Sequence, residues 1–237
     1  MHSGRLTEVP AARCADGTRY ASGLSSRLAA RQSATEFPGH PWPMSRILVI
    51  QGHPDSSLRH FGHALADAYA AAALAAGHAV QTVEVARLDF PLLRSQAEWQ
   101  HGSVPPALLP VQQQILWAEH LVFCFPLWLG DMPALLKGFI EQVARPGFAI
   151  DPQGGAPLGQ KVLRGRSARV VVTMGMPALM YRFYFRAHSV KSLERNILGY
   201  IGIAPVHATL IGNVEGIDDK ARSAWLAKLG TLGASAQ

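Results

Sequence analysis

The chain has 237 residues, of which 49% are hydrophobic and 16% charged, a balance that suits a globular α/β protein with one substantial core and excludes a disordered chain. A formal net charge of +6 permits attraction to anions, among them nucleotide cofactors, nucleic acid and membrane surfaces. No run of about 18 apolar residues lacks a charge or a breaker, so no membrane insertion is expected. Cys14 and Cys124 lie far apart and indicate neither a disulfide framework nor a zinc site, so we expect no metal and a cytoplasmic protein.

Residues 1–43 are rich in Ser, Ala, Arg, Gly and Pro and show no sustained period. Met44 stands directly before the first strand-like run, so we interpret residues 1–43 as a disordered or over-extended leader; an organelle-targeting peptide is the alternative. One folded domain is therefore expected over residues 44–237.

From Arg46 onward, β-branched apolar runs alternate with helical patterns, as in βαβ units that build a parallel sheet. The expected strands are Arg46–Gln51, Ala79–Val85, His120–Phe125, Ala168–Thr173 and Pro205–Ile211. The expected helices are His60–Ala76, Pro110–Ala118, Pro133–Val143, a stretch around Ser189–Tyr200, and Asp218–Leu229. This alternation predicts a doubly wound α/β fold with strand order 2-1-3-4-5, in which ligands bind beyond the carboxyl ends of the strands.

Three loops follow those carboxyl ends, at Gly52–His60, Pro126–Met132 and Met174–Tyr184. The first enters a helix whose free N–H groups and dipole attract anions. His53, Ser56, Ser57 and His60 can donate hydrogen bonds to a phosphate in this loop. A strand-to-helix turn in which Pro, Asp and Ser merely cap is the alternative. The two commonest nucleotide motifs, Gly-x-Gly-x-x-Gly and Gly-x-x-x-x-Gly-Lys-Ser/Thr, are absent from the loop.

The second loop, 126–132, holds apolar and aromatic side chains directly after a strand. Exposing such side chains to water is costly, which predicts that something covers them, and a planar ring fits. Packing under a neighbouring loop or in a subunit interface is the alternative.

Pro126-Leu127-Trp128, followed by the run from Met132 to Phe139, resembles the flavin-binding segment of the NAD(P)H quinone oxidoreductase family. Gly52-His53-Pro54 resembles the first flavin-phosphate loop of that family, and Thr173-Met174-Gly175-Met176 resembles its Thr-Thr-Gly-Gly loop. The similarity runs from about Met44 to about Ile211 and implies a flavodoxin-like fold. The first loop is about two residues longer than usual, and Met176 replaces the second glycine.

The resemblance implies a flavin, either FMN or FAD, with NAD(P)H as co-substrate and a quinone as acceptor. It places His53 and Phe61 near the flavin phosphate and ribityl chain, and it directs the N–H groups of Thr173–Met176 at the edge of the ring that gains negative charge on reduction. Tyr181 and His188 are implied as hydrogen-bond donors to the acceptor oxygen. The residues implied to line the ring are Pro126, Leu127, Trp128, Leu129 and Gly130.

Hydride transfer by a ping-pong mechanism is the function that this resemblance implies, in a homodimer for which the aromatic strip Tyr181–Phe185 is the expected contact surface. An ancillary regulatory subunit of a potassium efflux system, with a membrane transporter as partner, is the alternative. A phospho-acceptor domain is disfavoured, because Gln51-Gly52 and Phe125-Pro126 stand where such a site needs acidic residues.

Two basic segments remain. The aromatic and basic segment 181–191 is not expected to bind nucleic acid. The cations before the fourth strand are interpreted as a solvated loop, with a role in binding the NADPH 2′-phosphate as the alternative; they are Lys161, Arg164, Arg166 and Arg169.

Overall fold

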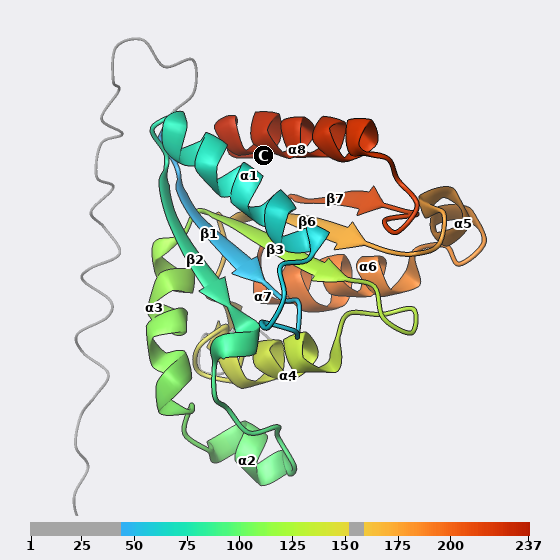
Figure 1. Ribbon diagram of the computed structural model, residues 1–237. Helices are drawn as coiled ribbons and strands as arrows, with labels where there is room; N and C mark the ends of the chain where they lie inside the picture. The colour runs from blue at the N-terminus through green and yellow to red at the C-terminus, as the bar shows by residue number, and fades with distance from the viewer. Residues whose placement is uncertain (1–43, 152–158) are drawn as a thin grey trace, which may run out of the picture. The chain divides into compact units, whose positions relative to one another are not determined.

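The computed structural model describes residues 44–151 and 159–237, so the expectation for residues 1–43 falls outside the described ranges (Figure 1). Five parallel strands form one sheet in the order β2-β1-β3-β6-β7. Numbered along the chain, this is the predicted order 2-1-3-4-5, which confirms the doubly wound fold. The strands are β1 (Arg46–Gln51), β2 (Ala79–Glu84), β3 (His120–Pro126), β6 (Ser167–Thr173) and β7 (Val206–Ile211), each within one residue of its predicted bounds.

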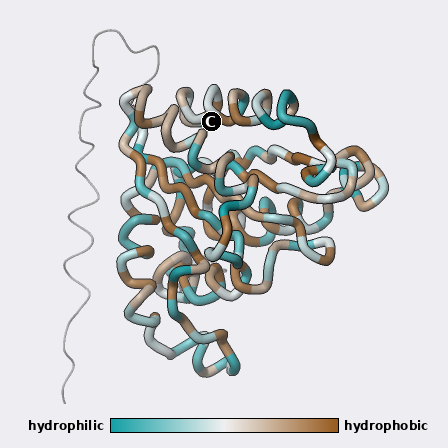
Figure 2. The backbone as a smooth tube through the Cα atoms, in the orientation of Figure 1, coloured by the Kyte–Doolittle hydropathy of each residue, from teal (hydrophilic) through white to brown (hydrophobic). Residues whose placement is uncertain are grey.

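The central strands are buried almost throughout, as parallel strands with helices on both faces should be. In β3 the six residues from His120 to Phe125 are buried, and in β6 the six from Ala168 to Thr173. Figure 2 shows hydrophobic residues along these strands and a mixed pattern along the surface helices. The apolar runs that predicted the strands are therefore the middle layer of the core.

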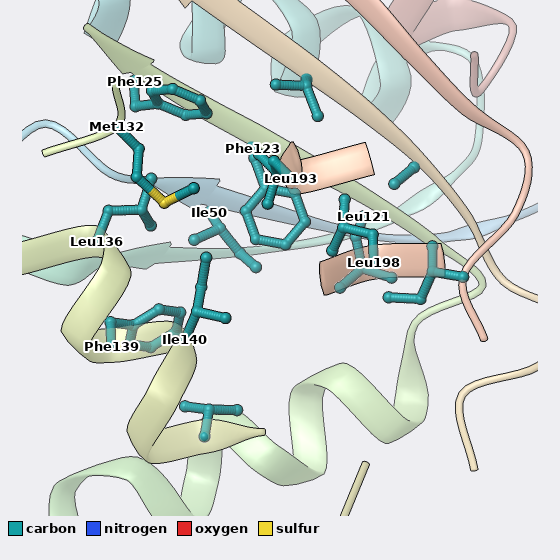
Figure 3. Close-up of a cluster of buried hydrophobic side chains, with 14 of the residues drawn as sticks. Ile50, Leu121, Phe123, Phe125, Met132, Leu136, Phe139, Ile140, Leu193 and Leu198 are labelled. Atoms are coloured by element: carbon teal, nitrogen blue, oxygen red, sulfur yellow. The ribbon is translucent and has the colours of Figure 1, made fainter. Parts of the chain in front are cut away.

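Two helical layers cover the sheet (Figure 1). On one face, α1 (Phe61–Ala75) and α8 (Asp219–Ala234) pack on the side chains of Ile47 and Val49. The other face carries the larger core cluster, in which Phe139 and Ile140 meet Ile50 and Phe123 from the sheet (Figure 3). The helices of that face are α3 (Leu109–Trp117), α4 (Ala134–Val143) and the continuous segment α6 (His188–Ser192), η3 (Leu193–Leu198) and α7 (Gly199–Ile201).

The contact between α1 and α8 is unusually close. A Cβ added to Gly233 would lie 2.2 Å from the carbonyl oxygen of Tyr69, so only glycine fits at this crossing. Asp218 caps α8 as predicted, its side chain accepting the Ala221 N–H at 2.7 Å. The helix nevertheless continues past its predicted end at Leu229, because the small residues that follow pack against α1.

Several short elements lie outside the predicted set. The helix α2 begins after Ser95, whose side chain accepts the Glu98 N–H. None of the helices in the described part of the chain is both long and apolar enough to cross a membrane. The additional elements are η1 (Val85–Arg87), α2 (Gln96–His101), η2 (Pro106–Leu108), α5 (Ala178–Phe183) and the hairpin of β4 (Ile150–Asp151) and β5 (Gln160–Lys161).

The interpretation of the basic run as a solvated loop is wrong for three of its four cations. Lys161 donates to the Gly199 carbonyl, and Arg166 caps the end of α3 by donating to the carbonyls of Ile115 and Leu116. Arg169 is buried. These cations bind backbone groups near the amino ends of the strands, at the opposite edge from the three predicted loops, so they do not form a phosphate site beside those loops.

A buried polar cluster surrounds Arg169 at this amino edge of the sheet. The Arg169 guanidinium donates to Thr209 Oγ1 at 2.8 Å, and His120 Nδ1 lies 2.7 Å from Ser167 Oγ. His120 Nε2 is buried without a hydrogen-bond partner in the described chain. Burial, then electrostatic interaction with Arg169, His207 and His78, lowers the pKa of His120 to about 4, so this imidazole is neutral at pH 7.

Candidate functional site

The carboxyl ends of β1, β3 and β6 bring the three predicted loops to one edge of the sheet (Figure 1). The register places Gln51 beside Cys124 and Pro126 beside Thr173. Two backbone hydrogen bonds continue this alignment into the loops, from Gly52 N to Cys124 O and from Leu127 N to Thr173 O, both 2.7 Å long. The edge is therefore built by the sheet itself.

Three histidines gather in the first loop. The rings of His53 and His60 stack with their centroids 4.0 Å apart, and His63 lies 5.2 Å from His53. Trp128 from the second loop meets His53 edge-on at 5.8 Å. The structure thus brings together two predicted phosphate-loop residues and one predicted ring-lining residue. It adds His63, which follows His60 by three positions at the start of α1 and so lies on the same helix face.

Hydrogen bonds fix which ring nitrogens of this cluster carry protons. Nδ1 of His53 accepts the Asp55 N–H, and Nδ1 of His63 accepts the His60 N–H, both at 3.1 Å. A neutral imidazole with an accepting Nδ1 carries its proton on Nε2. Both buried histidines therefore present Nε2–H donors, and neither Nε2 has a hydrogen-bond partner within residues 44–151 and 159–237.

Burial and neighbouring charges favour the neutral forms of His53 and His63. Burial, then the neighbouring charges of His60 and His63, lowers the pKa of His53. Burial, then Arg59 and His60, lowers the pKa of His63. Hydrogen bonds from Ser57 and His60 lower the pKa of Asp55, whose Oδ2 lies 2.9 Å from His60 Nε2. In the described part of the chain, no group of His, Cys, Asp or Glu is arranged to hold a metal ion.

The start of α1 supplies further donors. The N–H groups of Phe61 and Gly62 have no acceptor within the described chain, as is usual for a first helical turn. Gln51 ties this turn to β1, because its amide donates to the Gly62 carbonyl and accepts the His53 N–H. The Phe61 ring packs towards α8, with the Arg222 guanidinium 5.1 Å from its centroid. Ser56 and Ser57 are exposed, and Ser57 donates to Asp55 rather than into the cluster.

The second loop is a tight turn closed by paired hydrogen bonds between Trp128 and Asp131, of 2.9 and 3.0 Å. Both central residues have positive φ, 48° at Leu129 and 82° at Gly130, as in the turns that fit twisted strands. A leucine in this region is strained. Its side chain is fully exposed, and the Trp128 side chain is half exposed. This turn projects apolar groups from the edge, while Pro126 and Leu127 are partly buried at its base.

The third loop continues β6. Thr173 and Met174 are buried, and the segment that follows β7 holds the turn by hydrogen bonds from Asn213 N to Met176 O and from Val214 N to Met174 O. The N–H groups of Gly175 and Met176 have no acceptor among the described residues. A Cβ added to Gly175 would meet no heavy atom within 4 Å. This backbone is therefore open to close approach from outside the protein.

Of the two predicted acceptor-side donors, only His188 is exposed. Tyr181 is 2% exposed, and its hydroxyl lies 2.6 Å from Ser189 Oγ while accepting the Val190 N–H at 3.3 Å. Tyr181 therefore joins α5 to α6 in this structure, and its hydroxyl does not face the edge. Composition alone does not distinguish this inward tyrosine from the exposed Tyr184 three residues later.

A cavity of about 860 Å³ lies away from the three loops. It is lined by α2, the second half of α4 and the segment 196–201, including Trp99, Ile140 and Tyr200. None of the three loops contributes to it. The chemistry-bearing groups therefore lie on the edge of the sheet and outside this cavity, as expected for a ligand bound at the switch point of a doubly wound sheet.

Comparison with known proteins agrees with the arrangement of strands and loops. A family model described as flavodoxin-like fold matches residues 45–232. The chain belongs to this flavodoxin-like family. A relative from Haemophilus influenzae, named an uncharacterized NAD(P)H oxidoreductase, is 30% identical over 76% of this chain and 89% of its own. An FMN-dependent NADH:quinone oxidoreductase from Ruegeria pomeroyi is 30% identical over 56% of this chain and 72% of its own.

Solved structures extend the comparison for this flavodoxin-like protein. Smu.1420 of Streptococcus mutans has a TM-score of 0.65 and 26% identity, covering 79% of this chain and 98% of its own. The NAD(P)H:quinone oxidoreductase of Methanothermobacter marburgensis has a TM-score of 0.68 and 24% identity, over 81% and 96% of the two chains. The similarity to the Methanothermobacter marburgensis structure shows that the two chains share a fold.

The described residues fit a flavin. A flavin phosphate needs donors, and the first loop offers unpaired N–H groups at Phe61 and Gly62 beside the Nε2–H of His53. The ring needs an apolar wall and donors at its polar edge, and the second and third loops offer Trp128 and the open backbone of Gly175. These N–H donors are unpaired in the described chain, and the Trp128 side chain is half exposed, so both are available to a flavin.

Proposed function

We propose that this protein is a flavin-dependent oxidoreductase that passes hydride from reduced nicotinamide to a quinone acceptor. The observation that carries the proposal is the pair of N–H groups at Gly175 and Met176 that have no acceptor among the described residues, at the same sheet edge as His53 and Trp128 and beside the free space that an added Gly175 Cβ would enter. The name of the Haemophilus relative supports an NAD(P)H oxidoreductase, and the name of the Ruegeria relative supports a quinone acceptor and FMN over FAD.

A bound flavin supplies reversible hydride acceptance, and the chain supplies everything around it. The donors of Phe61, Gly62 and His53 would hold the anionic phosphate. The Gly175 and Met176 N–H groups would stabilise negative charge at the polar edge of the ring, which favours the reduced state. Trp128 and Leu129 would cover one face of the ring and exclude water from it.

His188 would donate a hydrogen bond directly to the acceptor oxygen, because its side chain is exposed next to α5. Tyr181 would act on the acceptor only after exchanging its Ser189 hydrogen bond for one to the acceptor. The two residues therefore differ in accessibility, and His188→Gln should lower quinone turnover more than Tyr181→Phe does.

The ping-pong order, the homodimer and the cytoplasmic location are parts of the same proposal that rest on the resemblance. Parallel lines in double-reciprocal kinetics with NADPH and a benzoquinone would support ping-pong exchange. Sedimentation at several protein concentrations would test the dimer.

The decisive experiment is anaerobic spectroscopy of the purified full chain with added FMN. We expect FMN to bind, its visible bands to bleach with NADPH, and the bands to return with a benzoquinone. Trp128→Ala should weaken FMN binding at least tenfold, whereas Tyr200→Ala, a comparably exposed aromatic away from the three loops, should not. Failure to bind FMN or FAD would refute the proposal. Flavin binding without turnover would instead favour the regulatory role in a potassium efflux system.

A further inference from the structure

Three imidazole rings lie together at the amino end of α1, where the flavin phosphate is proposed to bind. We call them the histidine cluster, and it consists of His53, His60 and His63. The rings of His53 and His60 stack with their centroids 4.0 Å apart, and the His63 ring lies 5.8 Å from that of His60. His53 and His63 are each more than nine-tenths buried. The free N–H groups of the first helical turn are therefore bordered by three ionisable side chains of one kind.

The Nε2 atoms of His53 and His63 are unpaired in the described chain, yet they are not enclosed. Within residues 44–151 and 159–237, the side-chain nitrogens that are both enclosed and unpaired are His120 Nε2 and Arg145 Nε. The Nε2 atoms of His53 and His63 do not belong to that pair although both residues are buried, so solvent reaches them. Buried polar groups normally have a hydrogen-bond partner, so these two donors are available to the acceptor atoms of a ligand.

His53 and His63 are held in the neutral form. Nδ1 of His53 accepts the Asp55 N–H, and Nδ1 of His63 accepts the His60 N–H. Protonation of either ring would place a second N–H at Nδ1, against the backbone N–H that already points there. Burial, and then charge interactions with neighbouring side chains, also lowers the pKa of both rings. These two histidines therefore offer hydrogen-bond donors without a change of charge.

His60 differs from the other two rings because it pairs with a carboxylate. Its side chain is 37% exposed, and its Nε2 lies 2.9 Å from Asp55 Oδ2. A carboxylate at this distance stabilises a proton on an imidazole, the side chain that changes charge between pH 5 and 8. His60 is also the N-cap residue of α1. A phosphate dianion bound there would repel the Asp55 carboxylate, and a proton on His60 would offset part of that repulsion.

The other charged groups around the cluster come from four elements. In the first loop, Arg59 forms an ion pair with Asp67 of α1. Glu84 of β2 interacts electrostatically with His63, and Arg222 of α8 donates to a backbone carbonyl. Guanidinium and carboxylate groups keep their charge between pH 6 and 8, so they do not take up a proton in this range.

We infer that His60 takes up a proton when a phosphomonoester binds at the amino end of α1, while His53 and His63 stay neutral and donate from Nε2. The affinity for such a ligand then rises as the pH falls from about 8 towards about 6, where the phosphate itself begins to gain a proton. Among flavins, FMN carries this group, riboflavin has no phosphate, and FAD has phosphates only within a diphosphate bridge. The inference rests on the proposed function, and it adds a control by pH that a serine at position 60 could not supply.

Titration of the flavin-free full chain with FMN at about pH 8 and about pH 6.5 tests the inference, with flavin fluorescence as the readout. We expect the dissociation constant of FMN to be at least about fivefold lower at the lower pH. Calorimetry near pH 7 in two buffers of different ionisation enthalpy should show net uptake of about half a proton per FMN bound. The dissociation constant of riboflavin should change less than about twofold between the same pH values.

Three variants locate the proton. His60→Ser removes the ionisable ring but keeps a residue suited to an N-cap, and its FMN affinity should change less than about twofold with pH. His63→Gln cannot gain a charge but keeps a donor and an acceptor, so it should bind FMN more weakly and retain the wild-type dependence on pH. His101→Gln replaces an exposed histidine at the end of α2 and is the matched control, which should behave as the wild type does.

FMN binding with equal affinity at both pH values would overturn the inference and leave the proposed function standing. A pH dependence that persists in His60→Ser and disappears in His63→Gln would also overturn it, because the proton would then bind a ring that is held neutral. An equal pH dependence for riboflavin would overturn it as well, since the proton uptake would not depend on the phosphate. Failure of FMN, FAD and riboflavin to bind at any pH would refute the proposed function itself, and this inference with it.

Discussion

Gly175→Ala separates the roles of the third loop in folding and in flavin binding. Gly175 does not have positive φ, and an added Cβ would meet no heavy atom within 4 Å. Replacing such a glycine by alanine lowers the entropy of the unfolded chain and stabilises proteins by about 0.4–1 kcal/mol. We therefore expect the free energy of unfolding of the flavin-free protein to stay the same or rise by up to about 1 kcal/mol in urea titrations.

Flavin binding should change in the opposite direction. The methyl group would occupy the space through which a ring edge reaches the N–H groups of Gly175 and Met176. A lost hydrogen bond to a charged group costs about 1.5–3 kcal/mol, which corresponds to an increase of roughly 10- to 150-fold in the dissociation constant of FMN. Fluorescence quenching of FMN by the protein measures this constant directly.

Gly216→Ala is the matched control for this prediction. Gly216 also lacks positive φ, and the nearest heavy atom to its added Cβ would be 3.8 Å away. It should match Gly175→Ala in stability and leave FMN affinity unchanged. Equal FMN affinity in the wild type and in Gly175→Ala would show that no ligand approaches this backbone and would refute the assignment of the third loop.

Three further predictions concern stability. Burial lowers the pKa of His120 to about 4, so the unfolded chain takes up a proton at this residue at a higher pH than the folded protein does. The free energy of unfolding should therefore fall by about 3 kcal/mol between pH 6.5 and 4. If His120→Asn showed the same fall in urea titrations over this pH range, the prediction would be contradicted. Leu129→Asn should raise the stability of the flavin-free protein by up to about 1 kcal/mol by relieving left-handed strain, and a lower melting temperature would argue against it. Arg166→Met removes the hydrogen bonds to the Ile115 and Leu116 carbonyls and should lower the free energy of unfolding in urea by about 1–3 kcal/mol. The affinity for FMN should stay unchanged, and a weaker affinity would contradict this prediction.

The strands could be predicted closely because each is a short β-branched run buried on both faces, a pattern that local sequence carries. The end of α8 could not be predicted from the local sequence. Gly230 and Gly233 look like terminators, yet both lie within the helix, and Gly233 lets α8 approach α1, so a tertiary contact overrides a local signal. The short helices α2 and α5 were not predicted either, because six residues are too few to show a hydrophobic period.

For the site, sequence predicted which loops meet but not which side chains turn towards one another. His53, His60 and Trp128 were each singled out, and their ring contacts unite them. His63 was missed because its position looks like any polar residue in a first helical turn, although its spacing from His60 was available as a signal. Tyr181 illustrates the converse, because within an aromatic strip only packing decides which ring is buried.

The close crossing of α1 and α8 also bears on how the protein forms during synthesis. At about 5–20 residues per second, roughly seven to thirty seconds pass between the emergence of α1 and that of α8. During that interval the face of α1 around Tyr69 has no helix to cover it, and nearby Ile47 and Val49 are open on the same side of the sheet. Nascent chains stalled before residue 219 should therefore need a chaperone to shield this face, and the last helix of the fold would release it.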